Sequence, residues 1–267
     1  MNKKLVLGIA LFLAVVLTAG AQQYDSDFDF RVSPLGDGKS AVITKYVGNK
    51  QTVNIPPSIE GMTITKIDNS AFYGKEIIRI TIPNTVTSIG PGVFADCTKL
   101  TSITIPAGVT TIEDSTFNGC TSLTNITIPA SVTRIGEKAF QDCISLTSIT
   151  IPESVTSFGR EVFLRCRSLA SITLPTGLTN LSVAMFADCT SLTKITIPAG
   201  VTVIPGNTFR NCTKITSITL PAGVTDVVDR AFTGWTSSQT INIQSSTMGW
   251  SDKWRDGCNA KIVDLRR

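Results

Sequence analysis

Six cysteines are the residues whose type and spacing most invite a chemical interpretation, because each follows the previous one by 23 residues. Regularly spaced thiols could form disulfides or bind zinc. A disulfide needs two Cβ atoms facing each other about 3.8 Å apart, whereas residues one repeat apart project in parallel. Zinc sites use near pairs of ligands. We therefore expect buried free thiols, and Cys258 adds a seventh. The six are Cys97, Cys120, Cys143, Cys166, Cys189 and Cys212.

Other catalytic groups are missing or badly placed. The chain has no histidine, which is the usual base beside a nucleophilic serine or cysteine. Glu113 and Asp114 do not recur as a facing pair of carboxylates. Asp25, Asp27 and Asp29 resemble the start of a calcium loop but lack its later glycine and glutamate. We expect a protein that is not an enzyme and has no catalytic, cofactor-binding or metal-binding residues.

The cysteines belong to a longer pattern that repeats at the same step. Residues 100–122 read LTSITIPAGVTTIEDSTFNGCTS, and successive copies keep the proline and the phenylalanine. The apolar positions follow one another by three, two, four, three, five and three residues, which suits neither a lasting helix nor one long strand. A strict repeat of this length predicts a solenoid. The phenylalanines are Phe94, Phe117, Phe140, Phe163, Phe186, Phe209 and Phe232.

Within one unit, the elements that would position these residues can be assigned. Residues 102–105 should form a short strand that ends at Pro106, because proline cannot donate to the ladder. Residues 110–112 should form a second strand. Residues 114–119 should form a helical or 3₁₀ turn that buries Phe117. The fold class expected is a mainly β repeat solenoid with coils about 4.8 Å apart, capped at both ends.

The N-terminal residues 1–21 have the composition of a secretory signal peptide. A basic start precedes an apolar run from Leu5 to Leu17, and Ala19 and Ala21 stand as at a cleavage site. The alternative, a membrane anchor, would need a longer apolar run. We expect an exported protein that is secreted, periplasmic or associated with the cell surface, with no membrane span in the mature chain.

The remaining boundaries follow from where the repeat is irregular. Residues 22–52 alternate polar and apolar residues around a glycine-rich turn and should form an N-terminal β-hairpin cap. Residues 53–243 should form the solenoid, with about eight units. Residues 244–267 lose the pattern and should form a C-terminal cap containing a short helix from Ser251 to Asp256. The alternative for Trp250 and Trp254 is an exposed aromatic binding site.

The repeat also resembles a known family. The pattern Leu-x-x-Ile-x-Ile-Pro-x-x-Val-x-x-Ile-x-x-x-x-Phe-x-x-Cys, found over about residues 64–243, is similar to that of the BspA-like, or Treponema-type, leucine-rich repeat proteins. The hairpin and the Ile55-Pro56 strand look like the usual entry to that repeat. The resemblance implies a leucine-rich repeat fold. For function, it implies an exported or surface-attached protein that binds components of a host or neighbouring cell.

Two columns of threonine accompany the repeat. Alternation turns the first column away from the core, with a more variable residue two positions before each threonine. The second column, which includes Thr110, Thr133 and Thr156, follows the valine of each unit. Exposed strands favour threonine without any ligand, which would explain both columns. The functional alternative is a ligand-binding face formed by Arg79, Thr81, Ser102, Thr104, Asn125, Thr127, Ser148, Thr150, Ser171, Thr173, Lys194, Thr196, Ser217 and Thr219.

The partner is expected to be another protein of a host or neighbouring cell, which would make this an adhesion protein. A carbohydrate ligand and a purely structural role in the cell envelope are the alternatives; the face is rich in hydroxyl groups but poor in the aromatic rings that stack on sugars. Ice binding is a more distant idea. The net charge of +4 is too small and too scattered to predict a nucleic-acid partner. No cofactor is expected.

Overall fold

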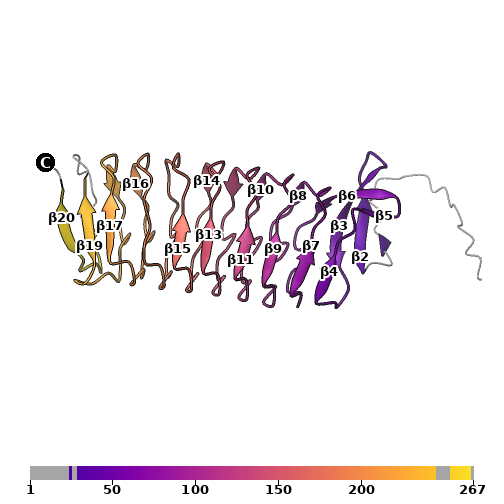
Figure 1. The fold of residues 1–267 in the computed structure, drawn as a ribbon, viewed down its shortest axis with the longest axis horizontal. Coiled ribbons are helices and arrows are strands. Elements are labelled where there is room, and N and C mark those ends of the chain that lie inside the picture. Colours follow the sequence, from indigo (N-terminus) through magenta and orange to yellow (C-terminus); the bar gives the residue numbers. More distant parts are fainter. Residues whose placement is uncertain (1–23, 26–28, 245–252, 266–267) are drawn as a thin grey trace, which may run out of the picture.

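The computed structural model describes residues 24–25, 29–244 and 253–265. The signal peptide expected at 1–21 and Trp250 lie outside the described residues. The chain winds into a β-solenoid of about 9 turns of ~23 residues, with no helix among the described residues. Figure 1 shows the strands side by side along the long axis of the molecule.

One row of strands comes from the Ile-x-Ile segment of each unit. These strands are three or four residues long, since the proline or the turn after it ends each one. The exposed side of this row is called the sheet face below. The row consists of β4 (Thr52–Asn54), β7 (Arg79–Thr81), β9 (Ser102–Thr104), β11 (Asn125–Thr127), β13 (Ser148–Thr150), β15 (Ser171–Thr173), β17 (Ser217–Leu220), β19 (Thr240–Ile243) and β20 (Lys261–Asp264).

A second row of strands comes from the Val-Thr-x-Ile segment and lies on another side of each coil. Apart from β6, its strands are only two residues long. Where they pair, the pairing is parallel, as between Thr111 and Arg134 and between Arg134 and Ser157. The row consists of β6 (Met62–Ile67), β8 (Ser88–Ile89), β10 (Thr111–Ile112), β12 (Arg134–Ile135), β14 (Ser157–Phe158), β16 (Val203–Ile204) and β18 (Asp226–Val227).

The strands of the first row pair in parallel and in register, so equivalent residues of successive coils are neighbours. Ser102 pairs with Asn125 and Thr104 with Thr127. The pairing is nevertheless incomplete. The ladders run β4-β7-β9-β11, then β13-β15, then β17-β19-β20, and no ladder among the described residues joins β11 to β13. Lys194 makes only an isolated bridge to Ser171, and its coil does not pair with β17.

A column of phenylalanine rings runs through the core of the stack, among buried isoleucine, leucine, valine and cysteine side chains. From Phe94 to Phe232, successive ring centroids are 5.4–5.8 Å apart and the ring planes differ by at most 14°. Each ring is completely buried. The stacking of Phe117, Phe140 and Phe163 that the repeat predicts is therefore confirmed, and it follows from placing one aromatic residue at the same point of every coil.

The expectation of a helical turn over residues 114–119 was wrong. This segment forms successive turns, in which Ser115 and Gly119 have positive φ angles of 55° and 72°. Right-handed helices require negative φ at every residue. The alternation turns the amides of Ser115, Phe117 and Gly119 towards the next coil, where they donate to the carbonyls of Glu137, Ala139 and Gln141. The intervening amides, of Thr116 and Asn118, donate within the turns to the carbonyls of Glu113 and Ser115, so local bonds alternate with bonds between coils.

Aromatic residues close both ends of the phenylalanine column. At the N-terminal end, β2 (Phe30–Pro34) and β3 (Ser40–Tyr46) form an antiparallel hairpin, and Tyr46 stacks on Phe72 with centroids 5.2 Å apart. The remaining N-terminal strands are β1 (Tyr24–Asp25) and β5 (Ser58–Ile59). At the C-terminal end, Trp235 and Trp254 meet Phe232 edge-on.

Residues 251–252, where the expected C-terminal helix from Ser251 to Asp256 would begin, lie outside the described residues, and residues 253–257 form turns. In the described part of the chain, no helix has the length and hydrophobicity that crossing a bilayer requires.

Candidate functional site

All fourteen residues predicted to form the ligand face lie on the sheet face, and all are exposed. Their arrangement follows from strand alternation, because the isoleucine or leucine between them points into the core. Ile103, for example, is 5% exposed between Ser102 and Thr104. The structure thus gathers residues that are 140 positions apart in the sequence, Arg79 and Thr219, into one continuous surface. That this surface binds a ligand remains a prediction.

The two threonine columns differ in what their hydroxyl groups do. In the second column, the hydroxyls of Thr133, Thr156 and Thr225 donate to the carbonyl oxygen of the equivalent threonine in the preceding coil, at 3.2–3.4 Å. A neighbouring column does the same: the Thr101 hydroxyl donates to the carbonyl oxygen of Ile78, and the Thr124 hydroxyl to the carbonyl oxygen of Thr101. These hydroxyls stabilise the stack, as exposed β-strand threonines commonly do.

The hydroxyls of the first column have no such role. In the part of the chain that the structure describes, the side chains of Thr81, Thr104, Thr127, Thr150, Thr173 and Thr196 make no hydrogen bond with protein groups. Thr219 accepts one long bond from Asn242, at 3.5 Å. Bonding within the stack thus accounts for three hydroxyls of the second column, and strand preference for threonine applies to both columns. The first column presents hydroxyl groups that are free to bond to a partner.

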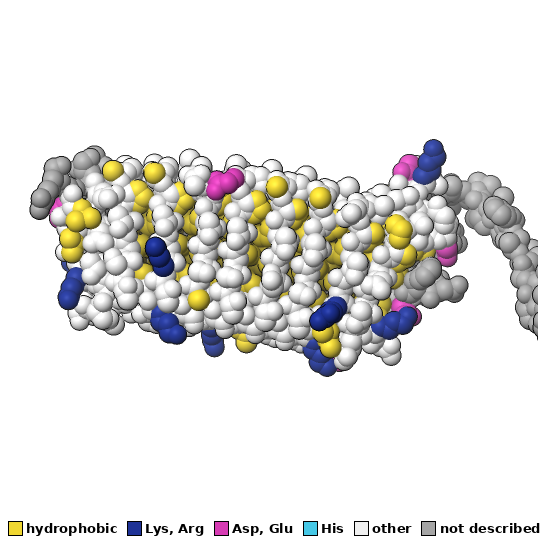
Figure 2. Space-filling view, viewed as in Figure 1, with side chains coloured by type: hydrophobic (Ala, Val, Ile, Leu, Met, Phe, Trp, Pro, Cys, Tyr) yellow, Lys and Arg dark blue, Asp and Glu magenta, His cyan; other side chains and the backbone are white. Residues whose placement is uncertain are grey.

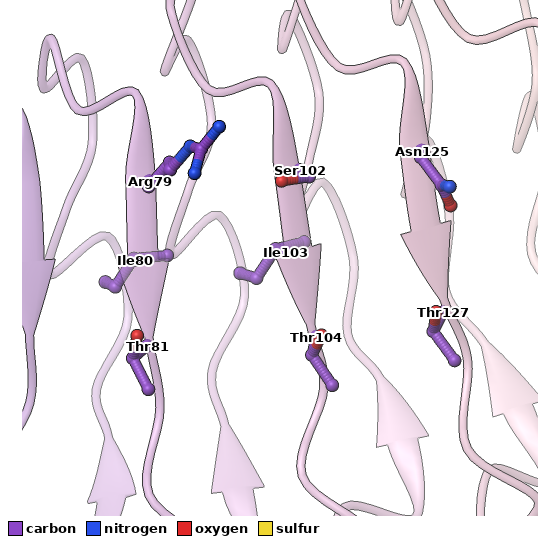
Figure 3. Close-up of a pocket in the computed structure, with 8 residues that line it drawn as sticks. All are labelled: Arg79, Ile80, Thr81, Ser102, Ile103, Thr104, Asn125 and Thr127. Atoms are coloured by element: carbon purple, nitrogen blue, oxygen red, sulfur yellow. The ribbon is translucent and has the colours of Figure 1, made fainter.

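Several hollows interrupt the sheet face, and two of them are lined by a basic residue. The first has a volume of about 280 Å³ and lies over β7, β9 and β11, where Arg79, Ser102 and Asn125 form one row and Thr81, Thr104 and Thr127 a second (Figure 3). The second, of about 600 Å³, lies between the coil of Lys194 and β17. Its lining residues are Thr193, Lys194, Ile195, Thr196, Ile197, Ala199, Thr216, Ser217, Thr219, Pro221 and Gln244.

Both hollows lie where the strand pairing is incomplete. Between β7 and β9 the ladder pairs only Arg79 with Ser102, and between the coil of Lys194 and β17 no ladder forms. Figure 2 shows apolar side chains between the coils of this face. Apolar residues line part of each hollow, and hydroxyl, amide and cationic groups line the rest. The apolar residues are Ile80 and Ile103 in the first hollow and Ile195, Ile197, Ala199 and Pro221 in the second.

The sequence did not identify Gln244, Thr193 and Thr216 as part of this surface. Gln244 follows the last regular strand, and the two threonines precede the outward-facing position of their strands. The second hollow results from missing strand pairing, which the repeat pattern does not reveal, since the coil of Lys194 keeps every apolar position of its neighbours.

The cysteine column offers no reactive thiol. All seven cysteines are buried and unbonded to one another. Each of the six repeat cysteines donates from Sγ to a phenylalanine carbonyl, as Cys166 does to Phe140 at 3.1 Å. Burial raises the pKa of the Cys97 thiol to about 12 and that of Cys120 well above its usual value. The expected free thiols are thus confirmed as core residues. Trp235 stands where the next cysteine would be, and its Nε1 donates to the carbonyl oxygen of Phe209 at 2.9 Å.

Comparison with known proteins identifies the type of repeat. The family model described as the BspA type leucine rich repeat region matches residues 65–193 and 133–261, with six copies. A leucine-rich repeat protein of T. pallidum is 33% identical, with a TM-score of 0.66, over 70% of this chain and 88% of that protein. A leucine-rich repeat protein from Bacteroides ovatus is 26% identical, with a TM-score of 0.69, over 94% of this chain and 68% of that protein.

No curated protein matches the chain significantly. The family supports a role as a scaffold for interaction with other proteins, because repeat solenoids present long, continuous binding surfaces. The family match covers most of the chain, and the sequence had predicted the same repeat type. The chain belongs to the BspA-type leucine-rich repeat family.

Proposed function

We propose that this chain is an exported, non-enzymatic protein that binds a protein of a host or neighbouring cell through its sheet face, and that it serves adhesion. The observation that carries the proposal is that three hydroxyls of the second column are bonded within the stack, whereas six of the seven threonines of the first column make no side-chain hydrogen bond within the described residues. The hydroxyl of Thr133 is bonded within the stack, whereas those of Thr104, Thr127 and Thr150 are exposed and make no hydrogen bond with protein groups in the described part of the chain.

The composition of the face favours binding by shape and hydrogen bonds. None of its fourteen residues is Asp or Glu, and only Arg79 and Lys194 are charged. The regular row of threonine hydroxyls, with the serines of the neighbouring row, gives a partner many acceptors and donors. The variable positions Arg79, Asn125 and Lys194 supply the differences between coils that specific recognition requires.

The dimensions of the face limit how a partner can bind. Seven coils at roughly 4.8 Å, each with a three-residue strand of about 10 Å, give a strip of roughly 340 Å². A standard protein interface covers about 800 Å² on each partner. A globular partner must therefore also contact the turns at the edges of the strip, whereas an extended segment of a partner fits on the strip itself.

Export is supported by the composition of residues 1–21, and a non-enzymatic role by the buried state of the thiols and by the lack of histidine. Family membership supports the interaction role but names no partner.

A binding screen tests the proposal. The purified protein is presented to arrays of extracellular-matrix, host-cell and bacterial-surface proteins, with another folded leucine-rich repeat protein as control. We expect selective binding that is lost when Thr104, Thr127 and Thr150 are together replaced by Lys, and retained when Thr133 is replaced by Lys. Absence of any selective binding contradicts the proposal. Binding restricted to a glycan array would assign the sheet face to carbohydrate.

A further inference from the structure

We infer that the sheet face binds an extended acidic segment of its protein partner, whose carboxylates dock in the two hollows at Arg79 and Lys194. The inference rests on the proposed function and deepens it by stating the chemistry of the partner. It starts from a similarity between the two hollows: each is lined by apolar, hydroxyl-bearing and amide side chains and by one basic side chain, and neither is lined by a carboxylate.

The two basic side chains are not neutralised by an acidic neighbour, in contrast to several others on the solenoid. Arg165 is held by Asp142 through two bonds of 2.6 Å, and Arg210 by Asp188 at 2.6 Å. Arg79 and Lys194 have no ion-pair or hydrogen-bond partner within the described residues, although both are exposed. The Arg79 side chain extends over the space between β7 and β9 (Figure 3).

The surroundings of the face are also basic. Lys99, Arg167 and Lys214 occupy equivalent turns just before their strands, and Figure 2 shows Lys and Arg side chains along the lower edge of this face. Lys99 is paired with Glu76 at 3.1 Å. Glu153, at the opposite end of its strand, accepts hydrogen bonds from the amide and hydroxyl of Thr176. The charge that a partner meets on the strip is therefore positive.

The distance between the hollows sets the spacing of the acidic groups. Arg79 and Lys194 are 115 positions apart, which is five repeats of 23. Five coils at roughly 4.8 Å place them about 24 Å apart. An extended chain advances about 3.3 Å per residue, so two acidic residues about seven positions apart span the same distance. Nucleic acid carries a charge at far shorter intervals, and two isolated cations match it poorly.

Synthetic peptides test this spacing directly. The probes are 14-residue peptides of Ser, Thr and Gly with two Glu residues placed four, seven or ten positions apart, and matched peptides with Gln in place of Glu. Binding to the full chain is followed by fluorescence anisotropy. We expect the seven-position Glu peptide to bind about tenfold more tightly than its Gln counterpart, and to lose this advantage at high salt.

The matched variants remove two positive charges on or off the face. R79Q with K194Q should abolish the tenfold preference for the Glu peptide. The control, R160Q with K45Q, changes two exposed residues outside the sheet face and should preserve it. Circular dichroism spectra of both variants should equal that of the unmodified chain, since these side chains make no hydrogen bond or ion pair within the described residues.

The peptide results that would overturn the inference are equal binding of Glu and Gln peptides, a preference independent of spacing, and a preference that survives R79Q with K194Q. If the protein screen nevertheless finds a partner that the Thr-to-Lys face variant loses, the proposed function stands and only the acidic segment is excluded. If the screen finds no partner and the peptides do not bind, both proposals fail. DNA and heparin are tested with the same variants. If either binds, and loses more affinity on R79Q with K194Q than any peptide does, the face binds a polyanion and the inference is overturned.

Discussion

Replacing Phe163 by Ala tests how much the phenylalanine column contributes to stability. Phe163 lies in the middle of the stack, is completely buried, and is parallel to both neighbours. Its ring centroid is 5.5 Å from that of Phe140 and 5.7 Å from that of Phe186, with interplanar angles of 4° and 0°. The substitution removes two stacked pairs and leaves a cavity that the rigid coils above and below cannot fill.

The expected cost is large. Truncating a buried phenylalanine typically lowers the free energy of unfolding by about 3–5 kcal/mol. Each aromatic pair contributes about 0.5–1.5 kcal/mol beyond burial, so the upper end of that range applies here. Phe163→Leu keeps most of the volume but loses both pairs, and should cost about 1–3 kcal/mol.

Urea unfolding followed by two probes measures this loss. Far-ultraviolet circular dichroism reports the whole array, and tryptophan fluorescence reports the C-terminal end, because all three tryptophans follow residue 234. Repeat arrays are stabilised by interfaces between neighbouring units, so weakening a central interface should separate the two transitions. Thr150→Ala, an exposed control, should change the free energy of unfolding by less than about 0.5 kcal/mol. A loss below about 1 kcal/mol for Phe163→Ala would refute the reasoning.

Three further predictions follow from individual contacts. Trp235→Phe removes the donor to the Phe209 carbonyl and should lower the free energy of unfolding by about 1–3 kcal/mol, measured by urea titration with circular dichroism. The thiols should resist Ellman's reagent at pH 8 and all seven should react in guanidinium chloride, because all are buried and burial raises the pKa of the column thiols; rapid reaction of the native protein would contradict this. The Arg165 guanidinium lowers the pKa of Asp142, so this carboxylate contributes stability above its usual pKa and loses it as the pH falls through the lowered value. Asp142→Asn should therefore reduce the acid-side slope of thermal stability below about pH 4, and an unchanged slope would count against the pairing.

The solenoid could be predicted from the sequence because each repeat folds by local rules and the repeats stack along one axis. A phenylalanine at the same point of every coil must stack on its neighbours, and alternation around Ile103 turns Ser102 and Thr104 outwards. The cysteines could be placed in the core by the same argument. These features depend on position within the unit, which the sequence states directly.

Other features depend on how neighbouring coils are displaced, and the sequence does not show that. The turn over residues 114–119 was expected to be helical, but the positive φ of Ser115 directs amides to the next coil. The incomplete pairing beside Lys194 creates the larger hollow although its repeat is regular. The two threonine columns look equivalent in the sequence, and only the structure shows that the Thr133 hydroxyl is bonded and that of Thr127 is exposed without a hydrogen bond to protein groups.

Site-specific labelling tests most directly whether the sheet face is the binding surface. Because the natural cysteines are buried, a thiol introduced by Thr150→Cys on β13 or by Ser157→Cys on β14 can be labelled selectively with a maleimide dye. The labelling rate is measured with and without the tightest-binding protein from the screen. The account predicts that the partner slows labelling at position 150 and leaves position 157 unchanged; protection of position 157 with free labelling at position 150 would contradict it.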